Sequence, residues 1–155
     1  MPHSTTPTQQ RIERALACRY RIADHREAWP RILPGLEKLH RQYVDQDWDI
    51  AGIRSMLDDD LALLLTDDND DTAFAIVRFD DYVYNPDEKE LYVYLLWHKG
   101  GDVIERYQPH LDFFALLGGA KYLRFYSRRP AFLRVAKRAG YQPRGIEYVK
   151  ELSHG

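Results

Sequence analysis

The sequence predicts a single mixed α/β domain in which helices flank a mostly antiparallel sheet. Segments of alternating apolar residues, segments with helical spacing, and clusters of Gly, Pro, Asn and Asp between them carry this prediction. The chain has 155 residues, of which 45% are hydrophobic and 30% charged, as expected of one soluble domain with its own core. The predicted order is β-α-α-β-β-β-α-β-α-β, with antiparallel strands in the middle and a late β-α-β crossover.

The first third of the chain contains an arm, a strand and two helices. The first residues are rich in Thr, Pro and Gln, so residues 1–17 are predicted to be a flexible N-terminal arm before a domain over 18–155. Residues 18–24, CRYRIAD, alternate as a strand does. A helix is expected to start near Pro34, because proline starts helices but disrupts their interior. A second helix follows Asp49, a residue type that caps helices.

Three strands follow in the middle of the chain. Residues 61–68 predict a short buried strand, 69–71 a turn, 72–85 a longer strand and 85–88 a second turn. The segment 89–99, KELYVYLLWHK, has the most regular alternation. That alternation assigns its residues to two faces of the sheet: Leu91, Val93, Leu95 and Trp97 on one, and Glu90, Tyr92, Tyr94 and Leu96 on the other.

The last third of the chain predicts two helices and two strands. Apolar residues at helical spacing place a helix over 103–117. Residues 121–128, KYLRFYSR, read as a strand. Pro130 and Gly140 stand where a helix starts and ends. Residues 141–152, YQPRGIEYVKEL, predict a final strand.

The order of elements and three local patterns resemble the GCN5-related N-acetyltransferase (GNAT) superfamily. The first pattern is YRIADHREAW, a strand followed by two helices. The second is LYVYLLWHKGGDVIERYQPH, a strand that passes through a glycine turn into a helix. The third is PAFLRVAKRAGYQPRG, a helix that ends in Gly140–Tyr141. The resemblance covers about residues 18–152 and extends to small proteins of this kind that are encoded by tailed bacteriophages.

The resemblance implies that acetyl-CoA or another acyl-CoA lies where the fourth and fifth strands splay apart, with its pyrophosphate on the turn. The first amides of a helix have no internal acceptor and carry partial positive charge, so they attract phosphate. The cofactor-binding residues implied are Trp97, His98, Lys99, Gly100, Gly101 and Arg129. Asp102 departs from the family pattern, and we expect it to cap the helix and to repel phosphate.

The catalytic residues implied by the resemblance also depart from the family pattern. The family tyrosine that protonates the departing thiolate aligns with Ala136, which has no proton to give. Tyr126, at the end of the fifth strand, is the predicted substitute, with Tyr92 and Tyr94 on the fourth strand as alternatives. Glu90, on the fourth strand, is the predicted base that takes a proton from the amine; the alternative is that Glu90 is a solvated residue at a strand end.

Composition excludes several other classes of protein. No histidine pair has metal-ligand spacing and Cys18 is the only cysteine, so no metal site is expected. Residues 91–155 hold 11 basic and 5 acidic residues, a net charge of +6, but the whole chain has a net charge of −2 and a pI near 6.3, which argues against a nucleic-acid partner. No apolar stretch is long enough for a membrane span, and we expect a cytoplasmic protein.

Two functions therefore remain open. The first is an enzyme that transfers an acetyl group from acetyl-CoA to an amine acceptor. The second is a non-catalytic interaction or structural module that keeps the same fold and binds a protein partner or assembles with itself. Such a module would suit a phage virion or assembly component, with the chain then located within a phage particle.

Overall fold

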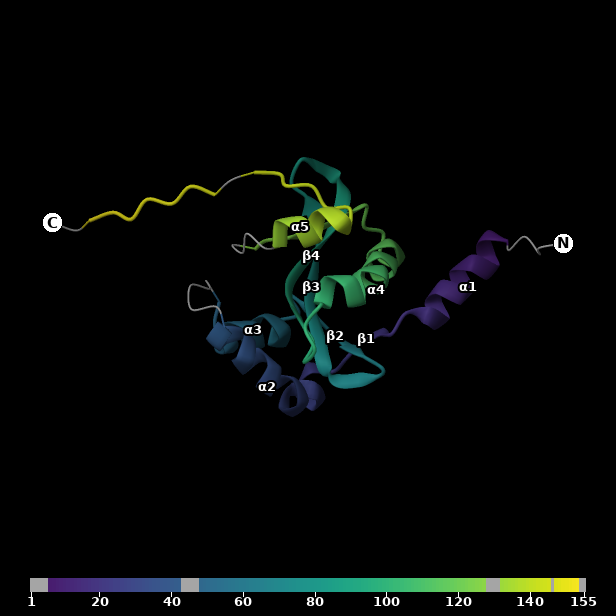
Figure 1. Cartoon of the computed structure of the whole chain (residues 1–155), viewed down its shortest axis with the longest axis horizontal. Coiled ribbons are helices and arrows are strands. Elements are labelled where there is room, and N and C mark those ends of the chain that lie inside the picture. Colours follow the sequence, from purple (N-terminus) through teal and green to yellow (C-terminus); the bar gives the residue numbers. More distant parts are fainter. Residues whose placement is uncertain (1–5, 43–47, 128–131, 146, 154–155) are drawn as a thin grey trace.

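A computed structural model of the chain describes residues 6–42, 48–127, 132–145 and 147–153. These residues form a five-stranded sheet with helices on both faces (Figure 1). In chain order the elements are α1 (Pro7–Ala17), β1 (Tyr20–Ile22), α2 (His25–Gln42), α3 (Ile50–Asp58), β2 (Leu63–Asp67), β3 (Asp70–Tyr82), β4 (Asn85–Trp97), α4 (Val103–Leu117), β5 (Tyr122–Phe125) and α5 (Phe132–Arg138).

The sheet has the strand order β1-β2-β3-β4-β5. Neighbours from β1 to β4 are antiparallel, whereas β5 lies parallel to β4 because α4 connects them as a crossover. This arrangement confirms the predicted fold class, a mixed and mostly antiparallel sheet flanked by helices. The hairpin between β3 and β4 turns at Val83–Tyr84, so the turn predicted over 85–88 is wrong by two residues.

Each face of the sheet has its own apolar core. On one face α4 packs through Tyr107 and Leu111 on strand residues that include Ala75 and Val77, and the only cysteine, Cys18, is buried in this core. On the other face α2 and α3 cover a second group of strand residues. The fully buried side chains of this second core include Ala28, Ile32, Leu36, Phe74 and Ile76.

An extra residue interrupts the ladder between β3 and β4. Ile76 of β3 lies opposite Leu95 of β4. The next residue, Val77, lies opposite Val93, so that Tyr94 has no counterpart. This is a β-bulge, which bends a strand and shifts its later side chains to the opposite faces.

Because of the bulge, the predicted faces of β4 are right for the first part of the strand and wrong for the last part. Leu91 and Val93 pack in the core under α4, as the regular alternation requires. Beyond the extra residue the assignment is reversed: Leu95 and Trp97 pack with α2, and Leu96 packs with α4. A strict period of two therefore holds for only the first part of this strand.

Helix α2 begins at His25 and contains both Pro30 and Pro34, so the predicted start near Pro34 is wrong. A proline inside a helix costs a hydrogen bond and crowds the preceding turn. Here the apolar stripe of the helix, which includes Ile32 and Leu36 with no exposed surface, is buried against the sheet. Burial of each such side chain contributes roughly 1.5–3 kcal/mol, enough together to offset the prolines.

The two ends of the described chain also differ from the predicted elements. Residues 7–17 form helix α1, which starts with a capping box: Thr6 Oγ1 accepts the Gln9 amide (3.1 Å), and Gln9 Oε1 accepts the Thr6 amide (2.9 Å). The final strand predicted over 141–152 is absent from the described residues 141–145 and 147–153, which carry no strand. Helix α1 and this C-terminal segment project from opposite sides of the body (Figure 1).

The close contact between α2 and β4 yields a test of the packing. A Cβ added at Gly35 would lie 2.7 Å from Trp97 Cε3 and 2.9 Å from Phe74 Cε1. We expect Gly35→Ala to reduce the free energy of unfolding by about 1–3 kcal/mol, because crowding in the core outweighs the better helix propensity of alanine. Urea denaturation measures this change. Gly145→Ala is the control, since its added Cβ meets nothing within 4 Å; equal stability of both variants would contradict the packing.

Candidate functional site

β4 extends beyond its pairing with β5, and we call the edge of Tyr94–Trp97, which has no described strand beside it on that side, the wedge. The parallel pairing runs from Glu90↔Tyr122 to Val93↔Phe125 and stops there. β4 continues to Trp97, whereas β5 ends at Phe125. The last paired residue of β4 directly precedes the bulge at Tyr94, so the strand bends where it loses its neighbour. β5 is paired with β4 along its whole length, so the divergence of the fourth and fifth strands stays a prediction.

The turn from β4 into α4 is organised by His98. The Gly100 amide donates to His98 Nδ1 (2.9 Å), and the Gly101 amide donates to the His98 carbonyl oxygen (3.0 Å). Gly101 adopts φ 69°, which favours glycine. Both glycine amides are therefore engaged within the turn.

Asp102 is the N-cap residue of α4, but it does not cap the helix. Its backbone is left-handed (φ 52°, ψ 37°), and its side chain makes no capping hydrogen bond, so the predicted capping role is wrong. In the left-handed conformation the carboxylate does not reach back to the first-turn amides, as an extended N-cap residue does. The amides of Val103 and Ile104 have no intrahelical acceptor and receive no side-chain cap from Asp102.

The other predicted cofactor-binding residues occupy different surroundings. The Trp97 ring stacks on Phe74 with centroids 5.9 Å apart, so the indole belongs to the core under α2. Lys99 is exposed, and its Nζ lies 3.9 Å from Asp70 Oδ2. Arg129 lies outside the described residues.

Glu90 is buried and ion-paired. Its side chain is 1% exposed, and Arg124 donates from Nε to Oε2 (2.8 Å) and from Nη2 to Oε1 (2.7 Å). The alternative of a solvated strand-end residue is therefore wrong. The hydrogen bond to Glu90 raises the pKa of Arg124. Both oxygens of the Glu90 carboxylate therefore accept hydrogen bonds from the same cation, the Arg124 guanidinium.

A strip of aromatic and cationic side chains lies beside the wedge. Arg124 lies over the Tyr92 ring (4.5 Å), and Arg78 over the Tyr94 ring (5.4 Å). The two tyrosine rings meet edge to face with centroids 4.6 Å apart. Burial raises the pKa of Tyr92, so its hydroxyl stays protonated at neutral pH. Such a strip offers π faces and hydrogen-bond donors to a ligand.

The predicted proton donor lies at the mouth of the wedge. Tyr126 is the first residue after β5, and its side chain is 51% exposed. Ala136 lies on α5, where its carbonyl oxygen accepts the Tyr141 amide (2.9 Å). The Tyr141 ring packs on Phe125 with centroids 4.9 Å apart, so α5 and the end of β5 are held together.

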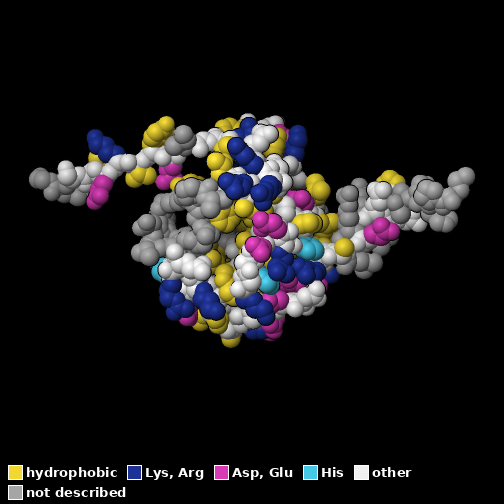
Figure 2. Space-filling view, viewed as in Figure 1, with side chains coloured by type: hydrophobic (Ala, Val, Ile, Leu, Met, Phe, Trp, Pro, Cys, Tyr) yellow, Lys and Arg dark blue, Asp and Glu magenta, His cyan; other side chains and the backbone are white. Residues whose placement is uncertain are grey.

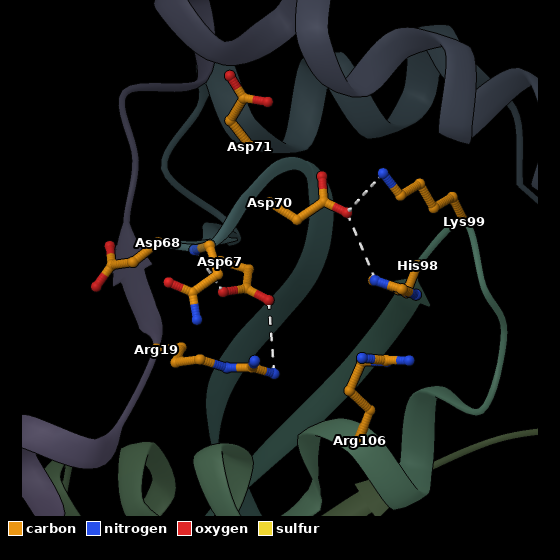
Figure 3. Close-up of a pocket in the computed structure, with 9 residues that line it drawn as sticks. Arg19, Asp67, Asp68, Asp70, Asp71, His98, Lys99 and Arg106 are labelled. Atoms are coloured by element: carbon orange, nitrogen blue, oxygen red, sulfur yellow. Dashed lines mark hydrogen bonds and ion pairs between the residues drawn. The ribbon is translucent and has the colours of Figure 1, made fainter.

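A polar cavity of about 530 Å³ lies beside the turn from β4 into α4 (Figure 3). It is lined by Arg19, Asp67, Asp68, Asn69, Asp70, Asp71, His98, Lys99 and Arg106. These residues come from the start of β1, the β2–β3 hairpin, the end of β4 and the first turn of α4. Sequence reasoning did not find this cavity, because no local motif joins four separate segments.

Tyr107, which is buried in the core under α4, contacts two residues that line this cavity. Its hydroxyl donates to Asp67 Oδ2 (2.7 Å), and its ring stacks on Tyr20 with centroids 4.8 Å apart. Arg19 lies 5.6 Å from the same ring and 3.6 Å from Asp67. Burial and the bond to Asp67 raise the pKa of Tyr107. The cluster joins α4 to β1 and β2.

The described residues contain no group of three or more His, Cys, Asp and Glu side chains placed to hold a metal ion. None of the described helices is both long and apolar enough to cross a bilayer. Both findings concern the described part of the chain alone.

The sequence matches no family model and no curated protein. Its structure, however, is similar to those of acetyltransferases. A crystal structure of a probable acetyltransferase has a TM-score of 0.63 and 11% identity, covering 88% of this chain and 99% of that one. A predicted acetyltransferase with acetyl-CoA from Clostridium acetobutylicum has a TM-score of 0.58 and 16% identity, covering 86% and 94%.

A third similar structure is an aminoglycoside acetyltransferase from an uncultured soil metagenomic sample, in complex with trehalose. It has a TM-score of 0.59 and 8% identity, and covers 86% of this chain and 95% of that one. The chain has the GNAT acetyltransferase fold. At these identities the similarity establishes the fold, and the function has to be argued from the site.

Two partly buried histidines yield a prediction on pH. His98 Nδ1 accepts the Gly100 amide, and His110 Nδ1 accepts the Arg19 amide (3.3 Å), so both rings are held neutral. Burial, together with a nearby arginine, lowers the pKa of both. As the pH falls, both histidines are therefore protonated at a higher pH in the unfolded chain than in the folded chain. The free energy of unfolding should decline as the pH falls below about 6.5.

Melting temperatures at about pH 7.5 and pH 5.5 test this expectation. Carboxylates with lowered pKa, such as Asp70, lose their contribution only near and below pH 4, so the two effects are separable. His110→Asn is a matched variant, since its side-chain oxygen can accept the Arg19 amide without titrating. The difference in melting temperature between the two pH values should be smaller for His110→Asn than for the parent. Equal melting temperatures of the parent at both pH values would refute the prediction.

Proposed function

We propose that the chain is a GNAT-fold N-acyltransferase that transfers an acetyl group from acetyl-CoA to an amine. One observation carries the proposal: the parallel β4–β5 pair stops at Val93↔Phe125, while β4 continues to Trp97 with no described strand beside it on that side. An extended pantetheine arm can pair with the free backbone edge of β4 in that space. β4 leads through a short turn into the start of α4, and a helix N-terminus can stabilise a phosphate.

The coenzyme phosphates would be held mainly by the first turn of α4. Because His98 engages the Gly100 and Gly101 amides, the amides of Val103 and Ile104 are the proposed pyrophosphate donors. Basic side chains gather over α5 (Figure 2), where Lys137 and Arg138 lie in its last turn. These cations would attract the remaining phosphate of the coenzyme.

The reaction assigned to the wedge is attack of a neutral amine on the thioester carbonyl carbon. The new C–N bond forms as the C–S bond breaks, the amine proton leaves to water, and the thiolate takes a proton from the Tyr126 hydroxyl. Both carboxylate oxygens of Glu90 already accept hydrogen bonds from Arg124. We therefore propose that Glu90 positions Arg124 in the strip that receives the acceptor.

A second candidate is a non-catalytic module that binds a protein partner or assembles with itself. Three observations favour it: the engaged glycine amides, the carboxylate of Asp102 at the phosphate position, and Ala136 in place of the family tyrosine. A phage particle is one setting for such a module. Binding of the coenzyme separates the two candidates.

Acetyl-CoA should raise the melting temperature of the protein. A ligand at about 100 times its Kd that binds only the native state adds about 2.7 kcal/mol, which corresponds to roughly 5–10 °C for a chain of this size. Differential scanning fluorimetry with acetyl-CoA measures the shift, and adenosine alone serves as the ligand control. No shift at millimolar acetyl-CoA would favour the module.

Asp102 allows a sharper test of where the phosphates bind. Asn adopts the left-handed backbone as readily as Asp, so Asp102→Asn removes a charge without strain. We expect its affinity for acetyl-CoA to rise about threefold to tenfold, because a like charge near the pyrophosphate is removed. Asp81→Asn, at the distant β3–β4 hairpin, is the matched charge control. If Asp102→Asn and Asp81→Asn bind acetyl-CoA with equal affinity, the turn from β4 into α4 does not bind the phosphates.

Tyr126→Phe tests the proton donor. Loss of the hydroxyl should lower kcat about 10²- to 10⁴-fold while leaving acetyl-CoA affinity unchanged. Steady-state kinetics with an amine acceptor measure kcat, and Tyr148→Phe in the exposed C-terminal segment is the control. An unchanged kcat for Tyr126→Phe would exclude Tyr126. A large loss of kcat for Glu90→Gln with an unchanged melting temperature would instead assign the base role to Glu90.

A further inference from the structure

We propose that the polar cavity beside the turn from β4 into α4 binds a small zwitterion, a molecule that carries both a carboxylate and an ammonium group, as a free amino acid does. The cavity has a volume of about 530 Å³, and sites for small molecules typically measure about 300–1,000 Å³. The inference stands apart from the proposed acyl transfer, because it is tested without coenzyme.

The charges that line the cavity are of both signs and nearly balance. The four carboxylates belong to the β2–β3 hairpin, whereas the three cations come from the other elements around the cavity. These residues are Asp67, Asp68, Asp70, Asp71, Arg19, Lys99 and Arg106. With His98 neutral, three positive and four negative charges leave a net charge of −1. A ligand with a single charge would meet side chains of its own sign, whereas a zwitterion matches both kinds.

Two arginines form the end of the cavity that would receive the carboxylate. Among the described residues no carboxylate lies within 4.0 Å of the Arg106 guanidinium, because the aspartates of the cavity pair with other cations. Arg19 Nε is buried and donates to no described acceptor, since the contact with Asp67 runs through Nη2 (3.6 Å). Figure 3 shows both arginine side chains directed into the cavity. Guanidinium groups bind carboxylates through parallel N–H donors.

Asp70 forms the end that would receive the ammonium group. Its Oδ1 accepts the amide (3.0 Å) and the hydroxyl (2.6 Å) of Thr72. Its Oδ2 is buried and accepts no hydrogen bond from the described residues, because His98 Nε2 at 3.5 Å and Lys99 Nζ at 3.9 Å are too distant. A buried oxygen without a donor is unfavourable, and an ammonium group brings three donors.

Other small occupants fit the cavity less well. A metal ion is disfavoured, because the described residues contain no group of three or more His, Cys, Asp and Glu side chains placed to hold one. A phosphate would bring its negative charges close to the four aspartates of the hairpin. The two buried atoms without partners, one donor and one acceptor, therefore favour a ligand that supplies an acceptor and a donor.

NMR titrations of the isotope-labelled full chain, without coenzyme, test the proposal. Glycine, L-serine and β-alanine are the zwitterionic probes, and acetate and ethylamine each carry only one of the two charges. We expect saturable shifts of the Asn69, Lys99 and Arg106 amide signals with at least one zwitterion, with a Kd at least about tenfold lower than for acetate or ethylamine. No saturable shift at concentrations up to hundreds of millimolar, or equally tight binding of acetate or ethylamine, would overturn the proposal.

Variants that remove one charge test the two ends of the cavity separately. Arg106→Gln and Asp70→Asn should each weaken binding of the zwitterion about tenfold or more, and Asp70→Asn keeps an oxygen for Thr72. Arg41→Gln, exposed in the last turn of α2, is the control and should bind as the parent does. Arg106 is exposed and has no ion pair among the described residues, so Arg106→Gln should keep the parent's melting temperature. Binding by Arg106→Gln with the parent's affinity would overturn the proposal.

Discussion

The faces of the sheet and the opening beside β4 depend on a single irregularity, the extra residue Tyr94 in the β3–β4 ladder. Without it, Leu95 and Trp97 would point at α4, and the core under α2 would lose two large side chains. The same residue directly follows the last pair between β4 and β5. One inserted residue thus fixes the packing of α2 and lies at the place where β4 passes beyond the end of β5.

The turn after β4 couples this opening to the polar cavity. His98 organises the glycine amides through Nδ1, while its Nε2 lies 3.5 Å from Asp70 on the β2–β3 hairpin. Tyr107, one helical turn into α4, holds Asp67 of β2. The start of α4 is therefore positioned from two sides by polar contacts, and its amides cannot shift without disturbing the hairpin.

Much of the fold follows from local patterns in the sequence. Alternating or short apolar runs located every strand from β1 to β5, and the spacing of apolar residues located α4. Periodicity could not reveal the bulge, because an extra residue changes the faces without changing residue types. The prolines of α2 were misjudged because burial of Ile32 and Leu36 outweighs their local cost. The TPTQ capping box at the start of α1 was readable and was overlooked.

The parts of the site that lie within one continuous segment could be predicted from the sequence, and the parts that join distant segments could not. The strand–glycine–helix turn lies in one segment, so its position could be inferred from LYVYLLWHKGGD. The ion pair of Glu90 with Arg124 joins residues 34 positions apart, and its register depends on the parallel pairing of β4 and β5. The cavity around Asp67 and Arg106 collects side chains from separate elements, which no linear motif records.

The burial of Cys18 has a practical consequence. The only thiol of the chain is 4% exposed, and its Sγ lies 3.8 Å from the His110 carbonyl oxygen. Maleimide reagents need an accessible thiolate, so the native protein should react slowly. A cysteine introduced on the surface would then be the single fast-labelling position, and fluorophores or spin labels could be attached site-specifically without first removing the natural residue.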